Sequence, residues 1–202
     1  MAVDFGVYHH SSKESSEKLR EISKIMFTEA FKKLGYSGDE KLKILDAGAG
    51  SGFLTYVTAM YFKNSDIIDI DNFSESLIDN SIERLDNNLR ELGIIDRVRI
   101  IKMDLLNMDI KESFDLVVSN LVLHNLGKRR FIAYKNIKKV LKCSGYFINA
   151  DGFIRKNIFV EPFKSDVSKI SDLFDVSFAM EPKDQKRTDV WRYILMALKP
   201  IC

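Results

Sequence analysis

The chain has 202 residues, 46% of them hydrophobic and 30% charged, and its formal net charge of +2 neither predicts nor excludes a nucleic-acid partner. This length favours one domain with a substantial core, and two cysteines and three histidines without metal-ligand spacing give no reason to expect a metal site. We find no signal peptide and no apolar run of about 18 residues, so we expect a cytoplasmic protein without a membrane span.

The first predicted element is an amphipathic helix. Ser11 and Glu14 have the spacing of a capping box in which Ser11 would be the N-cap. Apolar residues then recur at helical spacing, and Gly35 is a natural residue to end the helix. We therefore expect an N-terminal helical segment over residues 1–36, ahead of an α/β core over residues 41–202.

A glycine-rich turn opens the core. A short apolar run, typical of a buried strand, ends at Asp46, and Gly48, Gly50 and Gly52 follow at alternate positions before an apolar helix. Glycines adopt positive φ angles and let a ligand approach the backbone closely, and the N–H groups of such a turn suit an anion. Phe53 stands at the sixth position of a G-x-G-x-x-G pattern, where it would crowd a pyrophosphate, so a dinucleotide is disfavoured.

Strands and helices then alternate along the chain. This alternation predicts a doubly wound, mostly parallel α/β sheet of Rossmann-like type, with helices on both faces. We expect the second helix to be capped by Ser74 and ended by Gly93. The further expected strands are 67–71, 97–103, 114–119 and 146–150, and the expected helices are 53–62, 75–92 and 128–141.

The pattern of predicted elements changes over the last fifty residues. After a predicted helix at 163–173, two apolar runs at 174–180 and 190–198 are separated by nine polar residues. This pattern predicts an antiparallel hairpin at the edge of the sheet. A dinucleotide-binding domain would continue with parallel units instead.

Two strings in the chain carry a family resemblance. Residues 45–54 (LDAGAGSGFL) resemble the first motif of the class I S-adenosylmethionine-dependent methyltransferases. Residues 114–126 (FDLVVSNLVLHNL) resemble that family's fourth motif, in the version of small-molecule and quinone enzymes with type 11 or type 25 domains. Asn120 is followed by Leu121 and Val122, so the Asn-Pro-Pro-Tyr string of enzymes that methylate amino groups of nucleic acids and proteins is absent. The closing hairpin is also similar to the family's arrangement, and one such domain is expected over the whole chain.

The resemblance implies a cofactor site at the carboxyl ends of the strands, where ligands bind in doubly wound sheets. Asp71 would accept hydrogen bonds from both ribose hydroxyls, with Asp69, two residues earlier, as the competing assignment. Asp104 would accept from the adenine amine. The full set of expected binding residues for S-adenosyl-L-methionine, and for its product S-adenosyl-L-homocysteine, is Asp46, Gly48, Ala49, Gly50, Gly52, Asp71, Asn72, Asp104, Leu105 and Asn120.

Methyl transfer from a sulfonium is an in-line displacement in which the cofactor supplies the activation and the protein supplies the alignment. A general base is needed only when the acceptor must lose a proton. His124 and Asp151 are the candidate catalytic residues. In the resembling family an N-terminal helix often lies over the cofactor, and Tyr8 could then line the pocket together with His9 and His10. Simple packing of that helix against the sheet edge is the alternative.

Seven basic residues and no acid lie between 128 and 142. The stretch is either a solvated helix face or a contact for RNA. We therefore expect a methyltransferase acting on a small-molecule substrate, with an RNA methyltransferase and a non-catalytic cofactor-binding protein of the same fold as alternatives. The sequence does not predict the oligomeric state.

Overall fold

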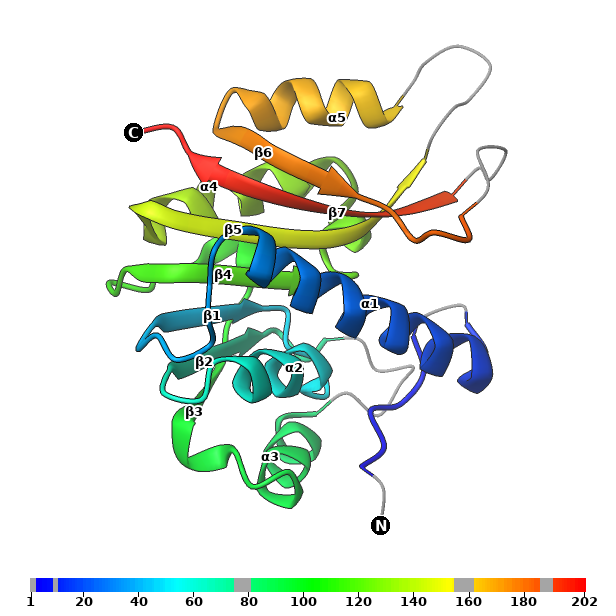
Figure 1. Cartoon of the computed structure of the whole chain (residues 1–202), viewed down its shortest axis with the longest axis vertical. Helices are drawn as coiled ribbons and strands as arrows, with labels where there is room; N and C mark the ends of the chain where they lie inside the picture. The colour runs from blue at the N-terminus through cyan, green and yellow to red at the C-terminus, as the bar shows by residue number, and fades with distance from the viewer. Residues whose placement is uncertain (1–2, 9–10, 75–80, 155–161, 186–190) are drawn as a thin grey trace.

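The computed structural model describes residues 3–8, 11–74, 81–154, 162–185 and 191–202, and a seven-stranded sheet forms the centre of this described part (Figure 1). The strands are β1 (Lys43–Ala47), β2 (Asp66–Asp71), β3 (Val98–Lys102), β4 (Phe114–Asn120), β5 (Leu141–Ile154), β6 (Phe174–Met180) and β7 (Trp191–Pro200). Their order is β3-β2-β1-β4-β5-β7-β6, and β7 runs antiparallel to both neighbours while the other pairs are parallel. The predicted doubly wound α/β fold with a closing antiparallel hairpin is confirmed.

Helices cover both faces of this sheet and create two hydrophobic cores. Because successive residues of a strand point to opposite faces, Ile44 of β1 and Leu45 beside it enter different cores. The Ile44 core includes side chains of α1, α2 and α3, and the Leu45 core includes side chains of α4 and α5 (Figure 1). The helices are α1 (Lys13–Lys33), α2 (Phe53–Tyr61), α3 (Ile82–Glu91), α4 (Arg130–Val140) and α5 (Pro162–Ser171), with 3-10 turns η1 (Ile95–Arg97), η2 (Leu105–Asn107) and η3 (Leu123–Arg129).

The N-cap of α1 is Ser12, so the predicted capping box at Ser11 is wrong. The backbone N–H of Ser11 donates to the carbonyl oxygen of Tyr8, at 3.0 Å, and this turn places Ser11 outside the helix. The hydroxyl of Ser12 instead accepts from the backbone N–H of Ser15 at 3.1 Å. The predicted end of the helix is confirmed, because Gly35 follows the C-cap with a φ of +88°.

The helix α3 begins later than predicted. Its N-cap is Ser81, whose hydroxyl accepts from the backbone N–H of Arg84 at 3.1 Å, and Gly93 follows its end with a φ of +68°. Ser74 does not cap this helix, because its own N–H and hydroxyl both donate to the side-chain oxygen of Asn72. The part of the predicted helix between residues 75 and 80 lies outside the described residues.

The strand β5 is longer than predicted, and the turn predicted at Ser144 and Gly145 is wrong, because both residues lie within the strand. Gly145 lies so close to β4 that a Cβ atom there would be 2.6 Å from the carbonyl oxygen of Asp115. The end of β5, from Asp151 to Ile154, pairs with the first residues of β7. Asp151 is therefore part of the strand, whereas the sequence placed it just beyond.

The basic stretch divides into two elements. Lys128 and Arg129 lie in the 3-10 turn η3, and α4 starts at Arg130 because Gly127, with φ +55° and ψ −131°, breaks the helical path. The guanidinium of Arg130 pairs with Asp166 on α5, and the ammonium of Lys142 pairs with Asp115 at 2.7 Å. Part of this charge is thus neutralised within the fold.

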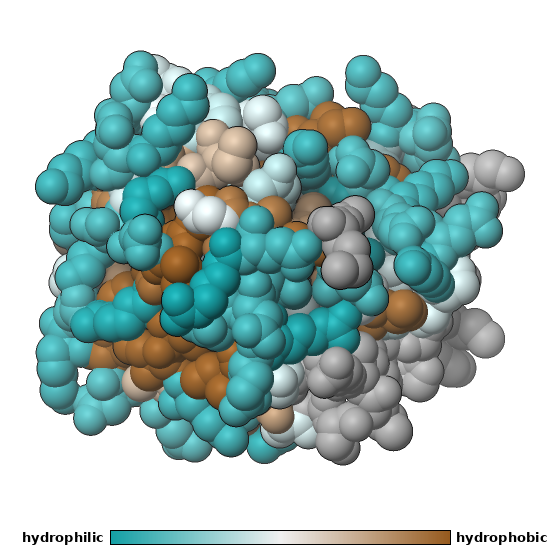
Figure 2. All heavy atoms as spheres, turned by 90° about the horizontal axis from the view of Figure 1, so that it is seen from below, coloured by the Kyte–Doolittle hydropathy of each residue, from teal (hydrophilic) through white to brown (hydrophobic). Residues whose placement is uncertain are grey.

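The surface seen from below is mostly hydrophilic, with hydrophobic side chains showing between the charged ones (Figure 2). Within the described ranges, no helix combines the length and the apolar character needed to cross a bilayer. No group of three His, Cys, Asp or Glu side chains suited to a metal ion occurs in this part of the chain either.

Cys143 and Cys202 form a disulfide that was not predicted from the sequence. The bond joins the beginning of β5 to the residue that follows β7 by two positions, across a sequence separation of 59. Disulfides persist mainly in oxidising compartments, whereas the cytoplasm, where we expected this protein, is reducing.

Reduction of this bond is expected to lower the free energy of unfolding by about 2–4 kcal/mol, because it restores chain entropy to the unfolded state. Urea unfolding with and without tris(2-carboxyethyl)phosphine measures the difference. The double variant Cys143→Ser/Cys202→Ser is the control, since its midpoint should not respond to the reductant. Equal midpoints for the oxidised and reduced wild type would contradict the expectation.

Candidate functional site

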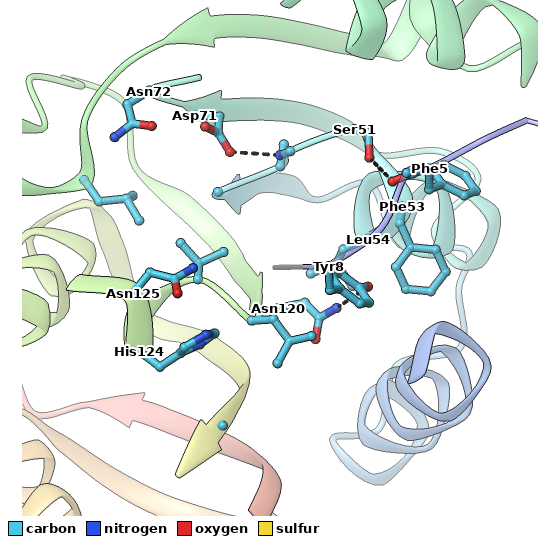
Figure 3. A pocket seen from close by; sticks show the side chains of 18 of the residues that line it. Phe5, Tyr8, Ser51, Phe53, Leu54, Asp71, Asn72, Asn120, His124 and Asn125 are labelled. Carbon is cyan, nitrogen blue, oxygen red and sulfur yellow. Dashed lines mark hydrogen bonds between the residues drawn. The ribbon is translucent and has the colours of Figure 1, made fainter. Parts of the chain in front are cut away.

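A cavity of about 870 Å³ lies at the carboxyl ends of β1, β2 and β4 (Figure 3). This volume is at the upper end of the range for ligand sites, about 300–1,000 Å³. Its wall includes the glycine turn, the loops after β2 and β3, the start of η3 and residues near the N-terminus, and side chains or backbone of α1, α2, α3, β5 and β7 complete it. Of the residues predicted for the site, Gly48, Ala49, Gly50, Asp71, Asn72, Asp104, Leu105, Asn120 and His124 line the cavity.

The glycine turn is folded back onto β2. The N–H groups of Gly48 and Ala49 both donate to the carbonyl oxygen of Ile70, at 2.8 and 3.1 Å, and the N–H of Gly52 donates to Ala49. These N–H groups are therefore not directed at a bound anion, contrary to our expectation for the turn.

All three glycines of the turn have positive φ angles, but the space beside them differs. A Cβ at Gly48 would lie 2.4 Å from a methyl carbon of Val122, and one at Gly52 would lie 2.7 Å from Leu85. At Gly50 a Cβ would meet no atom within 4 Å. Gly48 and Gly52 are thus required by packing, whereas the space beside Gly50 is open and belongs to the cavity wall.

Asp71 connects the glycine turn to the end of β2. Its Oδ2 accepts from the N–H of Gly50 at 2.9 Å (Figure 3), and its Oδ1 accepts from the N–H of Phe73 at 2.8 Å. Each carboxylate oxygen has a further lone pair, so both can still accept a hydroxyl from a ligand. The neighbouring Asn72 is exposed, with its side-chain oxygen accepting from Ser74.

Asp46 and Asp69 lie beneath the turn rather than in the cavity wall. They are paired in register on β1 and β2, both are fully buried, and the hydroxyl of Thr55 lies 2.9 Å from one carboxyl and 2.8 Å from the other. A hydroxyl has a single hydrogen, so it can donate to only one of them, and the other carboxyl must carry a proton that it donates to Thr55. Burial raises the pKa of both acids, and their mutual repulsion raises the pKa of Asp69 further.

The loop after β3 supplies the opposite wall. Asp104 is the N-cap of η2, and its Oδ1 accepts from the N–H of Leu106 at 2.9 Å. Leu105 is buried, and its carbonyl oxygen accepts from the side chain of Asn136 on α4. This loop is thus fixed from below while Asp104 and Leu105 face the cavity.

The segment that crosses the cavity is an N-terminal strap, residues 3–8, without helix or strand, whereas the sequence suggested a helix there with Tyr8 in the pocket. The hydroxyl of Ser51 donates to the carbonyl oxygen of Phe5 at 2.6 Å (Figure 3), and Arg84 donates to that of Asp4 at 2.9 Å. Arg20 of α1 donates to the carbonyl oxygen of Gly6, and its guanidinium lies 5.0 Å from the ring centre of Tyr8. These side chains donate to backbone carbonyl oxygens, which every residue has. The residue types of the strap therefore could not have predicted the contacts.

Tyr8 is a cavity residue, and His9 and His10 lie outside the described residues. The side-chain amide of Asn120 donates to the hydroxyl of Tyr8 at 3.2 Å, and the hydroxyl of Tyr193 donates to the amide oxygen of Asn120 at 2.6 Å. Tyr193 also lies 2.7 Å from the hydroxyl of Ser23 on α1. Burial raises the pKa of Tyr8 to about 12, so its hydroxyl is neutral at physiological pH.

His124 and Asp151 form a close pair at the other end of the cavity. The Nδ1 atom of His124 lies 2.5 Å from Oδ1 of Asp151, and the backbone N–H of His124 donates to Oδ2 at 3.0 Å. The side chain of Asp151 is 3% exposed and does not line the cavity itself, whereas that of His124 is 27% exposed and does. The carboxylate therefore orients the imidazole, which is the arrangement of a general base and its supporting acid.

Known proteins resemble this chain in sequence and in fold. Residues 38–188 match the model of a family described as a methyltransferase domain. Ribosomal protein L11 methyltransferase of Aquifex aeolicus (strain VF5) is 31% identical over 113 residues, which are 55% of this chain and 42% of that protein. The chain thus spans less than half the length of this relative.

Two solved structures illustrate the likeness in fold. A putative rRNA methylase from Clostridium thermocellum is 21% identical with a TM-score of 0.61, over 81% of this chain and 89% of that one. The N-methyltransferase NodS from Bradyrhizobium japonicum WM9, in complex with S-adenosyl-L-homocysteine, is 18% identical with a TM-score of 0.59, over 80% of each chain. At these identities the likeness concerns the fold alone.

Proposed function

Because the chain belongs to the class I S-adenosylmethionine-dependent methyltransferases, we propose that its cavity holds that cofactor and a small-molecule acceptor, to which the methyl group is transferred by in-line displacement. The observation that carries the choice of acceptor is the N-terminal strap: residues 5–8 form part of the wall of the same cavity as Asp71 and His124. A cavity roofed in this way fits a small molecule between the cofactor and His124 better than a folded macromolecule.

The residues present fit the cofactor. We assign the two oxygens of Asp71 to the ribose hydroxyls, since Asp71 lines the cavity and each of its oxygens can accept a further hydrogen bond. Asp104 and Leu105 are assigned to the adenine end, and Asn120 with Ala49 and Gly50 to the methionine end. Asp46 and Gly52, which we also expected to bind the cofactor, support the turn from below, and Asn72 stays in the assignment as a wall residue.

Arg20 joins the proposed methionine end, although the sequence did not single it out. Its side chain lines the cavity and is 7% exposed, it pairs with no acid among the described residues, and its Nε atom has no hydrogen-bond partner there. A buried cation without a counter-ion is costly. The carboxylate of the cofactor's methionine moiety would supply the missing negative charge.

We assign acceptor activation to His124. Asp151 accepts from Nδ1 of the imidazole, so in the neutral tautomer the basic lone pair is on Nε2, and we assign the acceptor's proton to this atom. The same carboxylate then stabilises the imidazolium that forms. The bound cofactor supplies the methyl group and a good leaving group, so the chain's own task is alignment, exclusion of water and removal of this proton.

An RNA acceptor is the second candidate, because the similar proteins include a putative rRNA methylase. The pairing of Arg130 with Asp166, and of Lys142 with Asp115, weakens the basic stretch as a phosphate-binding surface. A non-catalytic role is not favoured, since the matched family is a methyltransferase domain.

The two acceptor classes are separated by a labelled-methyl assay. The protein is incubated with methyl-labelled S-adenosylmethionine and, in parallel, with a small-metabolite extract or with total RNA, and we expect label in the metabolite fraction only. The variant Lys128→Gln/Lys135→Gln removes two exposed charges of the basic stretch. Turnover on the metabolite fraction should stay unchanged. RNA binding whose log K against log salt slope falls by about 0.7 per lost charge would instead favour the RNA acceptor.

A further inference from the structure

Trp191, the one tryptophan of the chain, lies beside His124 in the wall of the cavity. This residue is the first of β7, it lines the cavity, and 55% of its surface is exposed. An indole ring is costly to leave in water and offers a large flat apolar face. Its exposure inside a ligand cavity points to a ligand that covers it.

The backbone of β5 makes room for the indole. A Cβ atom at Gly152 would lie 2.6 Å from Cζ3 and 2.9 Å from Cε3 of Trp191, so the ring lies directly against this glycine. The residue before Gly152 is Asp151, which holds His124. Any larger side chain at Gly152 would displace the indole, so this glycine sets the position of the flat face relative to the proposed base.

The imidazole of His124 lies beside the indole of Trp191, nearly perpendicular to it. The two ring centres are 5.9 Å apart and the ring planes meet at 80°. A planar molecule stacked on the indole would be parallel to it and therefore nearly perpendicular to the imidazole, with the groups on its rim close to the imidazole. A hydroxyl on the edge of a ring is the group that this arrangement can deprotonate.

We propose that the methyl acceptor is a planar ring bearing an acidic hydroxyl, a phenol or a ring enol, which stacks on Trp191 with its O–H directed at His124. The inference rests on the proposed function and adds the chemical class of the substrate. In the reaction the hydroxyl proton passes to the imidazole and the oxygen lone pair forms the new O–C bond. The C–S bond breaks with its electron pair returning to sulfur, so that a methyl ether, S-adenosylhomocysteine and one proton result.

Fluorescence of the single tryptophan tests this proposal without turnover. The wild-type protein with saturating S-adenosylhomocysteine is titrated with catechol and 1,4-dihydroxynaphthalene, and separately with the saturated cyclohexane-1,2-diol and decahydronaphthalene-1,4-diol. We expect saturable quenching by at least one planar compound and none by its saturated counterpart. Equal responses to both, or no saturable response to either planar compound, would overturn the assignment of the substrate class.

Three variants separate stacking from proton removal. Trp191→Leu should raise the KM for the planar acceptor about tenfold with a smaller change in kcat, and Trp191→Phe should restore most of the loss because it keeps a flat ring. Gly152→Ala should displace the indole, shift its emission and weaken the quenching. His124→Gln should lower kcat and leave the quenching intact. A Trp191→Leu variant with wild-type KM for the planar acceptor would refute the stacking role.

Failure of this inference differs visibly from failure of the proposed function. Calorimetric titration of the wild type with S-adenosylhomocysteine is the deciding measurement. If the cofactor product binds and the planar hydroxyl compounds neither quench nor are methylated, the substrate class is wrong and the methyltransferase assignment stands. If S-adenosylhomocysteine itself does not bind, the proposed function fails first.

Discussion

Asp71→Ala is expected to weaken binding of S-adenosylhomocysteine by about 10²- to 10⁴-fold. The substitution removes two charge-assisted hydrogen bonds to the proposed ribose, each worth about 1.5–3 kcal/mol. It also leaves the N–H of Gly50 without the partner that fixes the glycine turn to the end of β2. Isothermal titration calorimetry measures the loss directly.

Asp71→Asn is the matched control, because the amide keeps the shape of the side chain and one acceptor oxygen. Its affinity should fall between those of the wild type and Asp71→Ala. Asp69→Asn changes an acid two residues earlier that is buried away from the cavity, and it should weaken binding less than Asp71→Ala. Near wild-type affinity for Asp71→Ala would show that the ribose lies elsewhere.

Asp69→Asn is expected to raise the stability of the folded protein above pH 7 and to flatten its pH dependence. In the wild type the pKa of Asp46 and of Asp69 is raised by burial, and Asp71 nearby raises both further. A carboxyl whose pKa is higher in the folded than in the unfolded state stabilises the fold below the unfolded value, near 4, and loses this contribution as pH rises through the folded value. The free energy of unfolding should therefore fall by up to about 1.4 kcal/mol for each unit that the pH rises within that window.

An amide at position 69 reduces this dependence, since it can donate to Thr55 at any pH and carries no charge, while burial still raises the pKa of Asp46. Urea unfolding at pH 5, 6, 7 and 8 gives the slope for both proteins. Asp66→Asn, on the same strand but exposed, is the control and should keep the wild-type slope. A wild-type slope in Asp69→Asn would mean that the two buried acids do not share a proton.

The mostly parallel sheet with its closing hairpin and the general place of the cavity could be predicted because they depend on patterns within the sequence. Alternating apolar runs and helical stretches determine a parallel sheet, and the carboxyl ends of its strands meet at one edge. Asp71 and Asp104 were placed at that edge for this reason. The burial of Asp69 could not be predicted, because residues 69 and 71 point to the same face of the strand. Whether such an acid is buried or lines the cavity depends only on how far it lies from the end of the strand.

Contacts between distant segments were not predictable. Arg84 binds a carbonyl oxygen 80 positions away, and Ser51 binds one 46 positions away, through bonds that any residue of the strap would accept. In the sequence Arg20 cannot be told apart from the other charged residues of its helix, and only its burial in the structure distinguishes it. The pairing of Cys143 with Cys202 likewise depends on β7 inserting beside β5.

The strap also has a consequence for the timing of turnover. Four side chains, Arg20, Ser51, Arg84 and Asn88, hold its carbonyl oxygens across the cavity. We expect a spent cofactor to leave past this strap, so that these bonds break and form again in every cycle. The opening frequency of residues 3–8 is therefore a ceiling on kcat that is independent of the acceptor, and a poor acceptor and a good one should converge on the same maximal rate once the chemical step outpaces it.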